Sequence, residues 1–125
     1  MATIELNKEN LVNTINENPF VIIDFWAPWC GPCQSFAPVY EQISEKYPDI
    51  VFAKVNTEQE QEIAAQFNIR SIPTLMIFRD QIIIYAEAGA LPAQTFEQLI
   101  EQAKNLDMDE VRKQVAEEQQ QAQGQ

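Results

Sequence analysis

The chain has 125 residues, which suits one domain with a single sizeable core. Its 46% hydrophobic and 22% charged residues are ordinary for a globular protein. Eight basic against 19 acidic residues give a formal net charge of −11, which argues against nucleic acid or an anionic membrane as the main partner.

The first half of the chain predicts strands that alternate with helices. Thr3–Leu6 is the candidate first strand. Asn7 is a candidate N-cap for the helix that follows, and Pro19 is expected to end that helix. Phe20–Trp26 is almost entirely apolar, as in a central strand covered on both faces. The residues expected to face the core from the helices on either side of that strand are Leu11, Val12, Ile15, Phe36, Val39, Tyr40, Ile43 and Tyr47.

The second half adds three strands and two helices. Val51–Asn56 has the pattern of a strand, and Thr57 with Glu60 resembles a capping box at the start of a helix. Thr74–Phe78 and Ile82–Tyr85 are close enough for an antiparallel hairpin. A final amphipathic helix carries Phe96, Leu99, Ile100 and Ala103. This order predicts an α/β fold in which a central mixed five-stranded sheet is flanked by helices on both faces.

The chain changes character at Asp107. Asp107 and Glu110 are candidate caps for a short helix, but beyond Ala116 the residues are Glu, Gln, Ala and Gly, as in a solvated or disordered segment. We therefore expect a domain over residues 1–106 and an acidic, Gln-rich C-terminal extension over 107–125, as a short helix or disordered.

Both cysteines lie in the segment Trp29-Cys30-Gly31-Pro32-Cys33. A disulfide that closes so small a ring adds little stability, so thiol–disulfide chemistry explains the pair better. Structural zinc needs four ligands, usually Cys or His, and the chain has no further Cys and no His. A metal shared between two subunits and a purely structural pair remain as alternatives.

Three separate motifs resemble the thioredoxin family, over residues 3–106. In chain order they are Asp24–Cys33, Ile72-Pro73-Thr74 and Gly89-Ala90. The resemblance implies the thioredoxin fold and a thiol–disulfide oxidoreductase that reduces disulfide-containing proteins. It also implies that no bound cofactor is needed and that a flavin- and NADPH-dependent thioredoxin reductase supplies the electrons. A monomer is the default expectation.

The two cysteines are expected to have different roles. Cys30 lies where a strand ends and a helix begins, so unpaired backbone N–H groups and the helix dipole favour its thiolate, and it should be the nucleophile. Cys33, one turn later on the same side, should resolve the mixed disulfide. Gly31 and Pro32 govern how readily the dithiol opens and closes. Gly-Pro is typical of the family's reducing members, so we expect a potential near the family value of about −270 mV.

Asp24 is an acid inside an apolar strand, on the same face as Ile22 and Trp26. Burial should raise its pKa. The resemblance implies that Asp24 lies beneath the cysteines and exchanges a proton with Cys33, with Lys54 as its partner and Trp26 as support. The alternatives are a buried acid kept only for hydrogen bonding and a lysine that extends to solvent.

The resemblance also implies a substrate-binding surface around Cys30. The Pro73 peptide bond would be cis, which exposes the Ile72 backbone for pairing with an extended substrate. The residues expected in this surface are Trp29, Ser71, Ile72, Ala88, Gly89 and Ala90. Ordinary surface or packing roles remain the alternative for Trp29, Ala88 and Ala90.

Three residues depart from the usual pattern of the family. Gln34 stands where many members have lysine, Ser71 replaces a common glycine, and Gln81 stands where hairpins favour glycine at positive φ. The departures, together with the extra acidic tail, put recognition by a standard reductase in question.

Two other classes of function fit the same segment. A binding module would hold a client on the apolar surface and use redox state as a switch. An oxidant or isomerase would differ in potential and compartment. The N-terminal residues lack a signal-peptide pattern and no apolar run is long enough to span a bilayer, so the expected location is the reducing cytoplasm.

Overall fold

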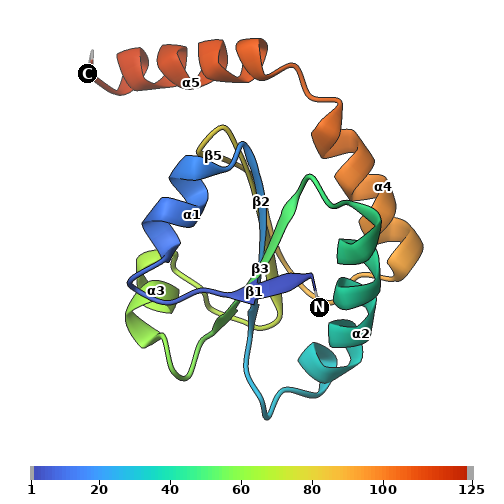
Figure 1. The fold of residues 1–125 in the computed structure, drawn as a ribbon. Helices are drawn as coiled ribbons and strands as arrows, with labels where there is room; N and C mark the ends of the chain where they lie inside the picture. The colour runs from blue at the N-terminus through green and yellow to red at the C-terminus, as the bar shows by residue number, and fades with distance from the viewer. Residues whose placement is uncertain (1, 124–125) are drawn as a thin grey trace.

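The computed structural model describes residues 2–123 and contains one five-stranded sheet (Figure 1). The strand order is β1-β3-β2-β4-β5, with β1, β3 and β2 parallel and with β4 antiparallel to both β2 and β5. The strands are β1 (Thr3–Glu5), β2 (Phe20–Trp26), β3 (Val51–Asn56), β4 (Thr74–Arg79) and β5 (Ile82–Ala88). The predicted mixed sheet, with the Phe20–Trp26 strand at its centre, is confirmed.

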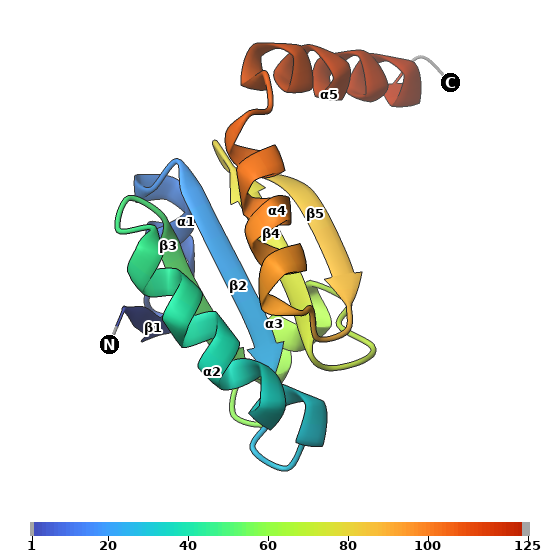
Figure 2. The same ribbon diagram turned by 90° about the vertical axis from the view of Figure 1, so that its right-hand side faces the viewer.

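Helices cover both faces of this sheet. Helices α2 and α4 lie against one face and α1 and α3 against the other, whereas α5 runs across one end of the molecule (Figures 1 and 2). The helices are α1 (Leu11–Glu17), α2 (Gly31–Lys46), α3 (Gln61–Gln66), α4 (Ala93–Lys104) and α5 (Met108–Gln123). No helix within residues 2–123 has the length and apolar character needed to cross a membrane.

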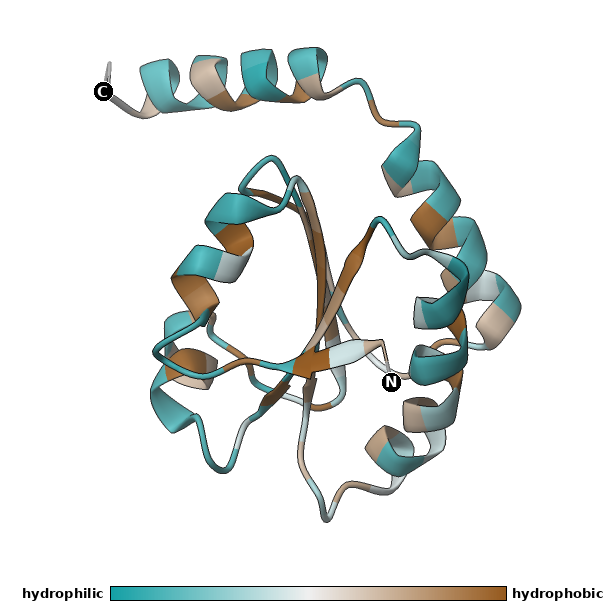
Figure 3. Cartoon of the chain, in the orientation of Figure 1, coloured by the Kyte–Doolittle hydropathy of each residue, from teal (hydrophilic) through white to brown (hydrophobic). Residues whose placement is uncertain are grey.

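The core consists of two apolar layers separated by the sheet. Ile22 of β2 packs with Tyr40 and Phe96 beneath α2 and α4, while Ile23 packs with Ile63 of α3 on the other face. Successive residues of a strand point to opposite faces, so a strand covered on both sides must be apolar throughout. Figure 3 shows the hydrophobic strands and the hydrophilic outer surfaces of the helices.

The first helix begins later than Asn7 predicts. Its N-cap is Asn10, and the Asn7 Oδ1 instead accepts hydrogen bonds from the backbone N–H groups of Glu9 and Asn10, which caps the turn before the helix. Asn7 as the N-cap of α1 is therefore a wrong prediction. Val12, predicted to be buried, is 61% exposed, because Leu11 and Ile15 form the core-facing side of α1 and the residue after Leu11 points about 100° away from it.

The predicted capping box at Thr57 and Glu60 is also wrong. The N-cap of α3 is Glu60, without a side-chain capping bond, and the Thr57 hydroxyl donates to the Trp26 carbonyl at 3.1 Å. The Thr57 backbone N–H donates to the same carbonyl, at 2.8 Å. Thr57 therefore extends the pairing of β3 with β2 and is not available to cap a helix.

The hairpin of β4 and β5 is confirmed, and its second strand continues to Ala88, beyond the predicted end at Tyr85. Its turn contains Asp80 at φ 50° and Gln81 at φ 69°. Both residues thus adopt the left-handed conformation that favours glycine.

The C-terminal extension forms a longer helix than predicted. Asp107 caps it, because its Oδ1 accepts the backbone N–H groups of Asp109 and Glu110, and α5 then continues to Gln123. Arg112 contacts the hairpin turn through Asp80, with Nη1 2.8 Å from Oδ2. Residues 1, 124 and 125 of the two predicted segments lie outside the described residues.

Candidate functional site

The two cysteines lie at the junction between β2 and α2, as the sequence predicts. Cys30 is the N-cap of α2, and Cys33 follows within its first turn. The two form a disulfide, with their Cα atoms 5.2 Å apart. The Cys33 backbone N–H lies 3.2 Å from the Cys30 Sγ and donates to it. An N–H group that the helix leaves unpaired is thus directed at the Cys30 sulfur, where it would stabilise a thiolate.

Both cysteines are largely buried, Cys30 being 5% and Cys33 3% exposed. They form a small apolar cluster with Ala27, and Trp26 and Ile72 pack against it. Ala27 was not predicted to take part, although its place between Trp26 and the cysteines is visible in the sequence. The cluster keeps most water away from the sulfur atoms.

Two further loops meet this cluster. The Ile72–Pro73 peptide bond is cis, as predicted, and the Ile72 carbonyl oxygen lies 3.8 Å from the Cys30 Sγ. The Gly89 N–H donates to the Pro73 carbonyl at 2.8 Å, which ties the second loop to the first. Gly89 has φ +113°, a conformation that other residues rarely adopt. The structure therefore brings together the three motifs that lie far apart in the sequence.

Trp29 is the most exposed large apolar side chain of the site, at 66%. Its indole Nε1 donates to Glu58 Oε1 at 2.6 Å, so the ring is held although it faces solvent. Sequence reasoning missed Glu58 because nothing distinguishes this acid from others in a surface turn. Ser71, Ala88 and Ala90 are exposed nearby in the chain segments that carry Ile72 and Gly89.

Gln34 contacts the loop that precedes Cys30. Its side-chain Nε2 donates to the Pro28 carbonyl at 2.7 Å, which links α2 to the loop before Cys30. The residue that departs from the family pattern thus contributes a neutral contact at the base of the dithiol loop.

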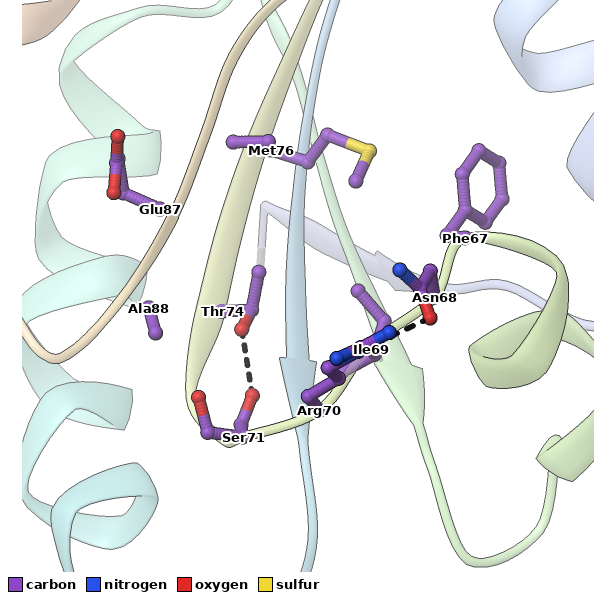
Figure 4. A pocket seen from close by; sticks show the side chains of 10 residues that line it. Phe67, Asn68, Ile69, Arg70, Ser71, Thr74, Met76, Glu87 and Ala88 are labelled. Atoms are coloured by element: carbon purple, nitrogen blue, oxygen red, sulfur yellow. Dashed lines mark hydrogen bonds between the residues drawn. The ribbon is translucent and has the colours of Figure 1, made fainter.

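A hollow of about 220 Å³ borders Ser71, between the segment that precedes β4 and the end of β5 (Figure 4). Figure 4 shows the Thr74 hydroxyl directed at Ser71, whose carbonyl accepts its hydrogen bond at 2.6 Å, and Arg70 directed at Asn68. The hollow is lined by Phe67, Asn68, Ile69, Arg70, Ser71, Thr74, Met76, Ala86, Glu87 and Ala88. It adjoins the predicted substrate surface at Ser71 and Ala88, and its lining is both apolar and polar.

Asp24 is buried in the centre of the sheet, with 1% of its surface exposed. Burial raises its pKa to about 7, an effect that Lys54 opposes and Glu5 reinforces. No hydrogen-bond partner for its Oδ1 lies among the described residues. Lys54 is the in-register neighbour of Asp24 on β3, and its Nζ lies 4.6 Å from the centre of the Trp26 ring.

Comparisons with known proteins agree with this site. The thioredoxin family model matches residues 2–102. A thioredoxin 2 of Streptomyces coelicolor is 57% identical over 121 residues, which cover 97% of this chain and 90% of that protein, so the similarity includes most of the C-terminal extension. Thioredoxin C-3 of Corynebacterium nephridii is 41% identical over 82% of this chain and 71% of its own length. The solved thioredoxin of Plasmodium falciparum superposes with a TM-score of 0.74 and 35% identity, covering 80% of this chain and 97% of that one.

Proposed function

The chain belongs to the thioredoxin family and is a thiol–disulfide oxidoreductase, and we propose that Cys30 attacks protein disulfides and Cys33 resolves them. The observation that carries this assignment is the geometry of the first turn of α2. The Cys30 sulfur accepts the Cys33 N–H at the positive end of the helix, whereas Cys33 lies inside the turn and is the more buried of the two.

The reaction transfers two electrons to the substrate. The Cys30 thiolate attacks one sulfur of a substrate disulfide, the substrate S–S bond breaks, and its other sulfur leaves as a thiolate that takes up a proton. Cys33 then loses its proton and attacks the Cys30 sulfur of the mixed disulfide. The second substrate sulfur leaves, and the chain is left with the Cys30–Cys33 disulfide that the structure contains.

We assign Asp24 as the group that accepts the Cys33 proton, with Lys54 as the cation that balances its charge. A carboxyl whose pKa burial raises to about 7 is half ionised near neutral pH and so can both accept and return a proton. The in-register position of Lys54 supports its pairing with Asp24. Trp26 supports both, since its ring packs beside the cysteines and beneath Lys54.

The substrate is proposed to bind in an extended conformation across the cysteines. The exposure of Trp29 and Ala90 and the contact of Ile72 with the cysteine cluster support apolar contacts with the substrate. The Ile72 carbonyl oxygen, 3.8 Å from the Cys30 Sγ, supports backbone pairing with a substrate strand. Ser71 and Gly89 complete this surface, while Gly31, Pro32 and Pro73 fix the backbone around the sulfur atoms.

We propose that a flavin- and NADPH-dependent thioredoxin reductase returns two electrons to the disulfide, and that the chain works as a monomer in the cytoplasm. Members of the family are reduced by such enzymes, and the Gly-Pro pair between the cysteines is typical of reducing members. The cytoplasm keeps protein thiols reduced, and a protein that reduces disulfides acts in such a compartment.

The test uses a variant whose reaction stops at the mixed disulfide, because it lacks the resolving thiol. Reduced Cys33→Ser, mixed with an oxidised protein substrate, should accumulate a mixed disulfide through Cys30, which mass spectrometry detects as the summed mass. The matched variant Cys30→Ser should form none under the same conditions. Equal trapping by both variants would reverse or remove the assigned roles, and clients retained by Cys30→Ser without a covalent link would favour a binding module.

A further inference from the structure

Glu5 lies in one row with Lys54 and Asp24 across three neighbouring strands. The Cα of Glu5 on β1 pairs with that of Lys54 on β3, and the Cα of Lys54 pairs with that of Asp24 on β2. Residues in register on adjacent parallel strands point to the same face of a sheet. One ammonium group is therefore flanked by two carboxyl groups on a single face.

From this row we infer that Glu5 is a positioning residue, which competes with Asp24 for Lys54 and thereby sets the pH at which Asp24 accepts the Cys33 proton. The inference rests on the role proposed above for Asp24. It adds to that role a residue at the edge of the sheet, two strands away from the dithiol.

The two carboxyl groups have unequal access to water. Asp24 is 1% exposed, whereas Glu5 lies on the edge strand and is exposed. Glu5 lines a hollow of about 390 Å³ together with Trp26, Asn56 and Glu60. A change at Glu5 can therefore act on the buried Asp24 without opening the core.

Lys54 acts on both acids through its charge. Although the residue is exposed overall, its carboxyl group is partly covered, and this partial burial raises the pKa of Glu5, while Lys54 and Trp26 oppose the effect. Lys54 likewise opposes the effect of burial on Asp24. The Glu5 anion in turn raises the pKa of Asp24. Substitution of Glu5 by a neutral residue removes this repulsion and leaves Lys54 with a single carboxylate, so the pKa of Asp24 should fall.

In the part of the chain that the structure describes, the neighbours of Asp24 on α2 and β4 carry no charge at the pH of the reaction. Tyr40 of α2 is fully buried, and burial raises its pKa well above the ordinary value, so it stays neutral at the pH of the reaction. The in-register neighbour of Asp24 on β4 is Leu75. Within residues 2–123, the charged groups that act on Asp24 are Lys54 and Glu5.

The substitution Glu5→Gln leaves the backbone of β1 in place. The Glu5 carbonyl accepts the Asn10 side-chain amide at 3.0 Å, and the Leu6 N–H donates to the Lys54 carbonyl at 2.8 Å. Neither bond uses the Glu5 carboxylate. Exposed Glu9 lies on the turn that follows β1, so Glu9→Gln removes the same charge outside the row and is the matched control.

The decisive experiment follows the Asp24 carboxyl by carbon-13 NMR during a pH titration of the oxidised full chain. Two strand spacings separate the carboxyl groups by about 10 Å, so Glu5→Gln should lower the Asp24 midpoint by about 0.5 to 1 pH unit. Glu9→Gln should leave the midpoint unchanged. Glu5→Asp, which retains the charge, should stay near the wild-type midpoint and also shows whether the position tolerates substitution.

A second readout is the pH profile of disulfide reduction. Its acid limb should move downward in Glu5→Gln by the same amount as the NMR midpoint. An unchanged Asp24 midpoint in Glu5→Gln, or an equal shift in Glu9→Gln, would overturn the inference. If the midpoint moves and the activity profile does not, the coupling of Glu5 to Asp24 stands, and the role of Asp24 as proton acceptor is the part that fails.

Discussion

At the scale of single residues, the buried Asp24 lowers the stability of the protein, because its ionised form is unfavourable in the core. The same burial makes it a group that can accept a proton near neutral pH. Its pKa is 3.8 without burial and about 7 in the folded chain. Between about pH 4 and about pH 7 the unfolded chain ionises Asp24 while the folded chain keeps most of it protonated. Stability therefore falls as the pH rises from about 4 to about 7, by up to about 4 kcal/mol.

Asp24→Asn should remove this dependence. We expect the variant to be about 2 to 4 kcal/mol more stable than wild type at pH 8 and close to it at pH 4, because both carry a neutral side chain at the lower pH. Urea unfolding of the oxidised proteins at both pH values measures the difference. Exposed Asp49→Asn is the control and should show no such trend. A stability gain of equal size at both pH values would contradict the buried-charge explanation.

At the scale of the elements, the turn of the β4–β5 hairpin has a strained backbone conformation that a substitution can relieve. Gln81 has φ 69°, where a side chain meets the backbone, and glycine would relieve this contact. Gln81→Gly should therefore raise the free energy of unfolding by about 0.5 to 1 kcal/mol. Gln81→Ala keeps the Cβ and should bring no gain in the same urea titration. Equal stability of the two variants would mean that the turn relaxes without glycine.

The elements that could be predicted are those specified by apolar patterns. The all-apolar run of β2 identified a central strand, and the helical spacing of Phe36, Tyr40 and Ile43 identified the buried face of α2. Predictions that relied on side-chain capping failed at Asn7 and Thr57. A capping side chain can bond to any nearby backbone group, and tertiary contacts decide which one.

The candidate site was predictable to the extent that local sequence determines it. The cysteines and their helix start lie within four residues of one another, so their geometry follows from the sequence alone. The bond between Trp29 and Glu58 and the row that joins Glu5 to Asp24 depend on the order of strands in the sheet. No pattern in the sequence specifies those contacts.

At the scale of the whole molecule, the C-terminal extension lies away from the dithiol. Arg112 of α5 contacts Asp80, whose N–H donates to the Pro19 carbonyl at the start of β2, whereas Cys30 follows the end of β2. Figure 1 shows α5 and the loop that leads into α2 at opposite ends of the molecule. We therefore expect the extension to affect stability and not catalysis.

A chain that ends at Leu106 should keep its fold and its rate of disulfide reduction. Its free energy of unfolding should fall by about 1 to 3 kcal/mol, because the truncation removes the buried Met108 side chain. Urea unfolding and a reductase assay test the two statements. Full-length Arg112→Gln should lose much less stability than the truncation, because the ion pair with Asp80 is exposed to solvent. A large fall in activity on truncation would give α5 a role in substrate recognition.

The central claim is that the Cys30–Cys33 pair reduces protein disulfides. The most direct measurement is the reduction of insulin disulfides with dithiothreitol as electron donor, for wild type and Cys30→Ser side by side. The account predicts rapid turnover by wild type, background rates for the variant, and a potential of about −270 mV in a glutathione titration of the wild-type dithiol. Turnover that survives in Cys30→Ser, or a wild-type rate no higher than background, would contradict it.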